Sequence, residues 1–457
     1  MTHRAATLAL LAVLLLGGLT AGELYRNEGL RARLAWEAFE GGGWLVPTLY
    51  GEPHLTKPPG MSVLIALCSL PAGQVTPVTA RLPSVLAGAA AAALVGWAVG
   101  RAFGARAGWL AAAILPCAPA WLDRVPSAEI DMVQLAWVTA SLVFLLRAIE
   151  DDRFAWWLAA LSCVAGGFFT KWTAPAFFYL TAAPLLWWRG QLRQLFRGPH
   201  LVAAALAVGL GLGWLALVGR SVGPAALLDA LSREGLSRLS PGHHPKPYPW
   251  GELATFPLGF LAICLPWSLV AVPALRPSFG DRLDDRQRLL WQLSLAWLLA
   301  ALAFWTLAPG HKPRHVLPAQ PAVAVLAALG CATRPRLRLV PRVALPGWLA
   351  VKLVWVAFLL PLRFHHGEVE EAAADLAAHV PETDILHLDN LKDECLLFYY
   401  GRPARRVRGL AGEPGAWCLL TEQEWRDHRG RVEARRRLSD SQRQPVWLVR
   451  VVRPGPG

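Results

Sequence analysis

Long apolar runs recur through the first 362 residues and predict a bundle of membrane-spanning helices. A helix needs about 20 mainly apolar residues to cross a bilayer, and we expect about eleven spans. The shorter run from Met61 to Leu70 follows a pair of prolines and is expected to pack at the membrane interface. The expected spans lie near residues 5–22, 80–101, 107–122, 130–147, 155–170, 173–188, 200–219, 254–275, 288–308, 314–331 and 343–361.

The first apolar run is open to two interpretations. Arg4 precedes a stretch that ends at Gly22, as in a cleaved signal peptide. The last residues of the stretch, Leu-Thr-Ala-Gly, form a poor cleavage site, and many further spans follow. We therefore expect this run to remain as a first transmembrane helix.

The pattern changes at Arg363, where long apolar runs end. Helical periodicity then alternates with short strand-like segments, which is typical of a small α/β domain. We expect a mainly α membrane domain over residues 1–362, with a large first outer loop over 23–79, and an α/β domain over 363–457. The helices are expected at 368–379 and 394–400, and the strands at 384–388, 405–407, 417–420 and 446–451.

Composition supports a membrane protein and excludes a single soluble globule, because 54% of the 457 residues are hydrophobic and only 17% are charged. The formal net charge is +13, but the arginines are dispersed over alternate short loops. This is the distribution of cytoplasmic loops under the positive-inside rule, and it does not favour nucleic-acid binding. With a cytoplasmic N-terminus, the outer segments are 23–59, 123–131, 220–250 and 309–315, and the C-terminal domain is also outer.

The polar and charged residues that could form a site are concentrated in these outer segments. A proline-locked loop from Gly43 to Pro59 carries Glu52, His54 and Lys57. A compact ammonium group suits an anionic ligand, although lysines at helix ends also serve as anchors that reach the membrane surface. Four of the six lysines fall in or beside outer segments: Lys57, Lys171, Lys246 and Lys312.

Several motifs, in this order, resemble the ArnT-like and protein O-mannosyltransferase-like glycosyltransferases. The resemblance implies the GT-C fold, with a C-terminal domain that matches in position only. It also implies transfer of a sugar from a polyprenyl-phosphate donor to an acceptor on the outer face. The motifs are Arg26-Asn27-Glu28, GGWLVPTLYGEPHLTKPP after Glu40, Ala80-Arg81-Leu82-Pro83-Ser84, Phe169-Thr170-Lys171 and His311-Lys312-Pro313-Arg314-His315.

For such a reaction, cations just above the spans would neutralise the charge that grows on the departing phosphate. Arginine would bind the phosphate through two parallel N–H donors, and lysine through one compact ammonium group. An acid would accept the proton of the attacking hydroxyl. The candidate substrate-binding residues are Arg31, Glu52, His54, Lys57, Arg81, Glu129, Lys171, His243, His244, Lys312 and Arg314.

The residues at the expected position of the catalytic carboxylate differ from the family motif. The family's first-loop motif begins with Asp followed by Glu, and here these positions hold Asn27 and Glu28. An amide cannot serve as a base, so Glu28 is the first candidate for that role. Alternatively, Asn27 only orients the acceptor and another acid acts. Glu52, Glu129 and Asp131 are the alternative acids, and Arg124 is the expected partner of the last two. Glu28 also suits a structural role in the first turn of a helix over 28–40.

Thr56 stands where the family has an acid before the lysine, which places a metal in this loop in doubt. A divalent metal held by Glu52 and His244 remains an alternative to solvent-exposed histidines. Five of the seven cysteines lie in apolar runs, and Cys395 and Cys418 are candidates for a disulfide in the outer domain.

The sequence thus predicts an inverting membrane glycosyltransferase in the inner membrane. Its expected partners are a polyprenyl-phosphate sugar, membrane lipids, and a lipid, glycan or protein acceptor. Two alternatives stay open. An inactive lipid-binding relative is suggested by Asn27, and a lipid-linked-sugar transporter would also carry charges in its spans, but at mid-span and with repeat symmetry.

Overall fold

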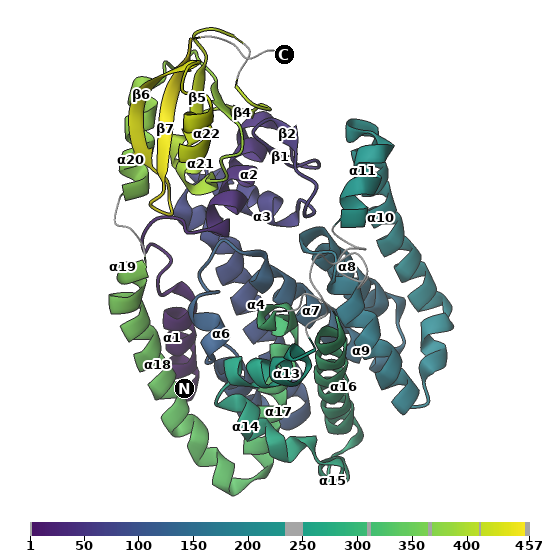
Figure 1. Cartoon of the computed structure of the whole chain (residues 1–457). Coiled ribbons are helices and arrows are strands. Elements are labelled where there is room, and N and C mark those ends of the chain that lie inside the picture. The colour runs from purple at the N-terminus through teal and green to yellow at the C-terminus, as the bar shows by residue number, and fades with distance from the viewer. Residues whose placement is uncertain (1, 234–249, 309–311, 364–367, 411–412, 453–457) are drawn as a thin grey trace. The chain divides into compact units, whose positions relative to one another are not determined.

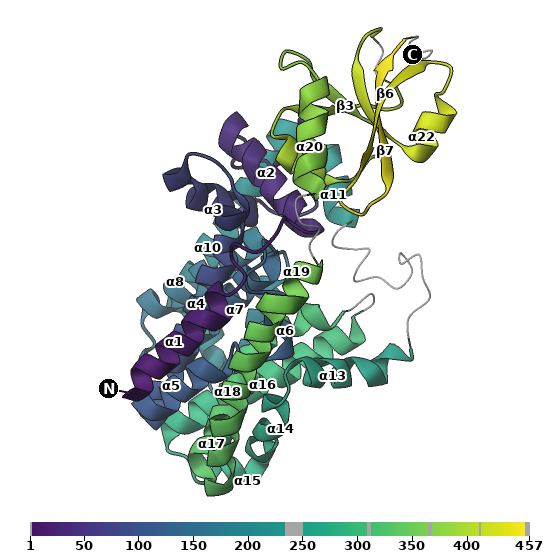
Figure 2. The same cartoon turned by 90° about the vertical axis from the view of Figure 1, so that its left-hand side faces the viewer.

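The computed structural model describes residues 2–233, 250–308, 312–363, 368–410 and 413–452. The chain forms two compact units. Unit 1 comprises residues 1–17, 56–61 and 83–355, and unit 2 comprises residues 18–55, 62–82 and 356–457. Figures 1 and 2 show the elements of each unit from two directions. The first loop and the C-terminal segment, far apart in the sequence, therefore belong to the same unit.

Unit 1 is a bundle of helices. Helices α7 and α17 run through its middle and are largely buried, whereas α10 and α18 lie at its periphery (Figure 1). The main helices are α1 (Thr2–Leu16), α4 (Pro77–Phe103), α5 (Ala105–Ile114), α6 (Pro119–Leu122), α7 (Ile130–Asp151), α8 (Phe154–Thr170), α9 (Ala174–Trp188), α10 (Gly198–Val222), α11 (Pro224–Leu231), α13 (Glu252–Ile263), α14 (Trp267–Ala271), α15 (Pro277–Gly280), α16 (Asp285–Leu307), η6 (Pro313–Ala319), α17 (Gln320–Thr333) and α18 (Val340–Val354).

Every apolar run expected to span the membrane is helical, but fewer than eleven are long enough to cross by themselves. Within the described residues, six helices meet the length and composition of a span, and a seventh is a pair bent by 98° between Ile263 and Trp267. The four remaining runs form helices of 15, 10, 17 and 15 residues, namely α1, α5, α8 and α9. Glycines and prolines between the runs account for the shorter lengths.

Unit 2 combines the first loop with a five-stranded sheet of order β4-β3-β5-β7-β6. Strand β3 is parallel to β4 and β5, and β7 is antiparallel to β5 and β6. The first loop contributes α2 (Asn27–Gly41), the short strands β1 (Thr48–Leu49) and β2 (Glu52–Pro53), and α3 (Gly60–Ser69), whose last residues lie in this unit. The C-terminal elements are α20 (Glu368–His379), β3 (Leu386–Leu388), α21 (Glu394–Tyr400), β4 (Ala404–Arg406), β5 (Trp417–Thr421), α22 (Glu422–Asp427), β6 (Val432–Ser439) and β7 (Pro445–Val451).

Helix α2 is held against α21 by a buried arginine. Arg33 is 1% exposed, and it donates hydrogen bonds to the carbonyls of Leu397 and Arg402 at 3.0 and 3.1 Å. It also pairs with Glu37 one turn further along α2. Burial lowers the pKa of Arg33, while the Glu37 carboxylate opposes that shift. A guanidinium buried in this way needs each of these acceptors, so α2 and α21 form one packed pair.

The candidate disulfide between Cys395 and Cys418 is not formed, since neither cysteine is disulfide-bonded. Cys395 begins α21 and faces α2, where its thiol donates to the carbonyl of Arg26. Cys418 lies in β5 and packs in an apolar cluster with Leu420 and Val449. The two side chains thus pack in different parts of unit 2. Burial raises the pKa of the Cys395 thiol above its ordinary value.

Replacement of Gly29 by Ala is expected to destabilise unit 2. A Cβ at this position would lie 2.5 Å from both the backbone nitrogen and the sulfur of Cys395, and the backbone of α21 cannot easily move. Overpacking of this kind costs about 1–3 kcal/mol, measurable as a lower thermal unfolding midpoint. Gly41→Ala in the same helix is the control, because its Cβ would meet nothing within 4 Å. Equal midpoints for the two variants would contradict this packing.

Candidate functional site

The start of α7 carries a cluster of charged side chains in unit 1. We define the charge cluster as Asp123, Arg124, Glu129, Asp131 and Lys171. Asp131 lies in the first turn of α7, and Lys171 directly follows the last residue of α8. Their side chains form a buried ion pair in which the Lys171 Nζ donates to Asp131 Oδ1 at 3.0 Å. A buried ion pair on apolar helices is costly to form and usually has a function.

Arg124 connects the remaining acids of the charge cluster. Its guanidinium lies 3.5 Å from Asp131, 3.8 Å from Glu129 and 3.7 Å from Asp123. The expected pairing of Arg124 with Glu129 and Asp131 is therefore confirmed. Arg314, in η6, adds a further favourable charge near Asp131. Two cations thus contact three carboxylates within the charge cluster.

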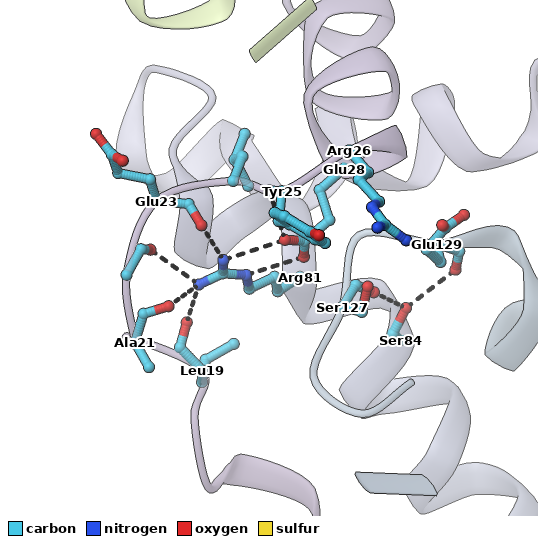
Figure 3. A network of polar contacts seen from close by, with 12 residues as sticks. Leu19, Ala21, Glu23, Tyr25, Arg26, Glu28, Arg81, Ser84, Ser127 and Glu129 are labelled. Carbon is cyan, nitrogen blue, oxygen red and sulfur yellow. Dashed lines mark hydrogen bonds and ion pairs between the residues drawn. The ribbon is translucent and has the colours of Figure 1, made fainter. Parts of the chain in front are cut away.

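Three different helices hold the loop that carries Arg124 and Glu129. Ser84 of α4 donates hydrogen bonds to the carbonyls of Ser127 and Glu129 (Figure 3). The indole of Trp121 donates to Gln320 of α17 at 2.7 Å. The ammonium of Lys352, on the otherwise exposed helix α18, donates to the carbonyls of Val125 and Leu122 at 2.7 and 3.5 Å.

Sequence reasoning passed over Lys352. The sequence does contain a signal for it, because Lys352 is a lone lysine inside an apolar run. An ionisable residue in a span usually faces a partner. The side chain is 1% exposed even though its helix is only 11% buried. Lys352 therefore holds α18 against the loop that positions Arg124.

Lys352→Met is expected to destabilise the protein by about 1.5–3 kcal/mol, the range for a hydrogen bond that involves a charged group. The Val125 carbonyl would lose its charged donor. The measurement is thermal unfolding in detergent, with Lys392→Met, an exposed lysine of unit 2, as the control. Lys352→Arg should recover part of the loss, since a cation remains. If all three variants unfold like the wild type, the Lys352 contact contributes nothing.

In unit 2, Glu28 and Arg81 form a second buried ion pair, shown in Figure 3. The guanidinium donates to both Glu28 carboxylate oxygens, at 3.0 and 3.2 Å. It also donates to four backbone carbonyls, and Glu28 accepts a further hydrogen bond from the Tyr25 backbone. All three nitrogens of Arg81 are thereby engaged, which fits a role in holding the first loop. The four carbonyls belong to Leu19, Ala21, Gly22 and Glu23.

The other sequence candidates divide between the two units. Lys57, Lys312 and Arg314 belong to unit 1 with the charge cluster, whereas Asn27, Arg31, Glu52 and His54 belong to unit 2 with Glu28 and Arg81. Lys57 donates to the carbonyl of its neighbour Thr56, and Lys312 is exposed. His243, His244 and Lys246 lie outside the described residues.

The candidate metal ligand Glu52 is exposed on β2. Over the residues that the structure describes, no group of three or more His, Cys, Asp and Glu side chains is arranged to hold a metal ion. The proposed partner of Glu52, His244, falls outside that set.

Comparison with known proteins supports the sequence resemblance. Residues 56–214 match the family model of dolichyl-phosphate-mannose-protein mannosyltransferases. An undecaprenyl phosphate-alpha-4-amino-4-deoxy-L-arabinose arabinosyl transferase of Pseudomonas aeruginosa is 30% identical over 334 residues, which cover 70% of this chain and 57% of the relative. A protein of the same description from Pectobacterium carotovorum is 26% identical over 331 residues, with the same coverage. The chain thus spans a little over half the length of these curated relatives.

Solved structures establish the fold. ArnT from Cupriavidus metallidurans bound to undecaprenyl phosphate aligns with a TM-score of 0.79 at 17% identity, over 100% of this chain and 99% of that one. The archaeal oligosaccharyltransferase AglB from Archaeoglobus fulgidus aligns with a TM-score of 0.53 at 11% identity, over 88% of this chain and 64% of that one. At these identities the likeness concerns the fold alone.

Proposed function

This chain is an ArnT-like protein with the GT-C fold, and from that premise we propose that it is an integral-membrane glycosyltransferase. It moves a sugar from a polyprenyl-phosphate donor to an acceptor on the outer face of the inner membrane. The observation that carries the proposal is the charge cluster, in which Lys171 and Arg124 surround Asp131 at the end of a span.

The charge cluster suits exchange of one anion for another. In the structure, Asp131 and Glu129 neutralise Lys171 and Arg124. The donor phosphate is a diester with one negative charge, and it can replace a carboxylate as the partner of the same cations. The phosphate monoester that leaves gains further negative charge, which these cations stabilise more strongly. When the donor binds, Lys171 and Arg124 turn to the phosphate, and Asp131 loses part of its ion pairing and becomes a stronger base.

The proposed reaction follows from this exchange. The acceptor oxygen attacks the anomeric carbon of the sugar while the carbon–oxygen bond to the phosphate breaks on the opposite side. The phosphate departs with the bonding electron pair, and Lys171, Arg124 and Arg314 stabilise its charge. Asp131, with Glu129 beside it, takes the acceptor proton. The sugar configuration is inverted.

We propose a different part for Glu28 from the one first expected. Both oxygens of Glu28 are engaged by Arg81, so Glu28 serves as a positioning residue that fixes the start of α2. Asn27 is the first residue of α2 and is exposed. The proposed acid is then Asp131, in the first turn of α7.

The test uses purified full-length protein in nanodiscs with a panel of polyprenyl-phosphate sugars and candidate acceptors. Release of free polyprenyl phosphate, followed by mass spectrometry, is the expected result for at least one donor. The Asp131→Asn variant serves as the inactive reference. Donor binding with no release from any donor, in the wild type, would favour the non-catalytic lipid-binding relative that Asn27 also suggests.

A further inference from the structure

A broad apolar groove lies on unit 1, away from the charge cluster. Helices α1, α4 and α5 line it, and its volume is about 780 Å³. This is within the size range of sites for small hydrophobic ligands. Its lining includes Leu11 and Leu15 of α1, Ala93 and Trp97 of α4, and Trp109 of α5. In a membrane an apolar groove of this size is filled by lipid chains and not by water.

One end of the groove is charged, because Arg101 forms part of the lining. Arg101 is in the last turn of α4, the end where that span leaves the membrane. Its guanidinium lies 5.2 Å from the ring of Trp97, which is itself 41% exposed. A cation next to an interfacial tryptophan is the usual composition of a headgroup-level site.

Two further arginines stand beside Arg101, around a single glutamate. Glu150 is 3.1 Å from Arg101, 2.5 Å from Arg147 and 3.5 Å from Arg286. Arg147 also contacts Asp151. We call these three arginines the arginine cluster. Its three positive charges meet two carboxylates, which leaves a net positive charge beside the groove.

We propose that the groove and the arginine cluster together bind one phospholipid with an anionic headgroup. Its acyl chains occupy the groove between α1, α4 and α5, and its phosphate contacts Arg101. Basic pockets between helices at the membrane boundary recognise anionic headgroups by this combination of chain burial and charge. The site is independent of the proposed sugar transfer, because none of its residues belongs to the charge cluster.

The experiment measures lipid binding directly. Full-length protein, delipidated in detergent, is mixed with equal amounts of phosphatidylglycerol and phosphatidylcholine of identical chains, and retained lipid is counted by native mass spectrometry. Wild-type protein is expected to retain phosphatidylglycerol preferentially. Arg101→Gln should lower that retention about fivefold, the factor for one cation near a membrane surface. Ala93→Phe, which fills the groove from an exposed position, should lower retention of both lipids.

Matched controls test the same changes elsewhere. Ala205→Phe adds a ring at an exposed site on α10, and Arg334→Gln removes an exposed arginine outside the groove. Neither is expected to change lipid retention. Equal retention of the two lipids by the wild type, or unchanged retention in both groove variants, overturns the proposal. A polyprenyl phosphate that displaces phosphatidylglycerol at equal concentration also overturns it, since the groove would then take the donor lipid.

Discussion

Asp131→Asn is expected to abolish sugar transfer, with kcat/KM lowered by at least about 10²–10³-fold, the usual effect of removing a general base. The amide can accept no proton, and it leaves Lys171 without its closest counter-charge. Lys171→Ala should cause a loss of similar size, but through weaker donor binding and poorer stabilisation of the phosphate. Release of polyprenyl phosphate and equilibrium binding of the donor measure the two contributions separately.

Folding must be distinguished from chemistry in these variants, because breaking a buried ion pair also costs stability. The double variant with Asp131→Asn and Lys171→Met removes both charges and should recover most of the lost stability without activity. Asp123→Asn is the control, since it removes a carboxylate 3.7 Å from Arg124 and leaves the Asp131–Lys171 pair intact. Full transfer activity in the folded double variant would exclude the charge cluster as the reaction site.

Arg81→Met is expected to lower the free energy of unfolding by about 3–5 kcal/mol, the usual effect of leaving a buried charge without its partner. Glu28 would lose both of its bonds to the guanidinium, and four first-loop carbonyls would lose their donor. Thermal unfolding and limited proteolysis of residues 18–25 report the effect.

The companion variant Glu28→Gln distinguishes the two roles considered for Glu28. A positioning role predicts lower stability, with donor binding and residual turnover retained at low temperature, because the Arg81 contacts to the backbone remain. A role as the catalytic base predicts normal stability with no turnover. The second result would restore Glu28 as the base and remove Asp131 from that role.

Local patterns explain which parts of the fold were predictable. The helices at 368–379 and 394–400 were predicted with their observed bounds. The first has one apolar stripe, and the second is an apolar and aromatic run between the capping residues Asp393 and Gly401. Strand β6 was missed, since its residues 433–437 are all exposed and show no alternation of apolar and polar side chains. Among the described residues, fewer than eleven of the expected runs form helices of span length, because proline and glycine end several of them early.

The candidate site was predictable only where its partners are close in the sequence. Arg124 was matched with Glu129 and Asp131 because they lie within eight residues. The contact of Asp131 with Lys171 joins residues 40 apart, and that of Glu28 with Arg81 joins residues 53 apart. Sequence reasoning identified these as isolated charges near a membrane surface, but tertiary packing decides which of them meet and which carbonyls they bind.

The grouping of residues 18–55 and 62–82 with residues 356–457 has a consequence for biosynthesis. The ribosome delivers α2 near the start of translation and α21 almost at the end, so Arg33 has no access to Leu397 until more than 360 further residues are made. For that time α2 is an incomplete nascent segment that chaperones must shield. A nonsense mutation anywhere before α21 thus yields a chain in which α2 never gains its packing partner, however well its membrane helices insert.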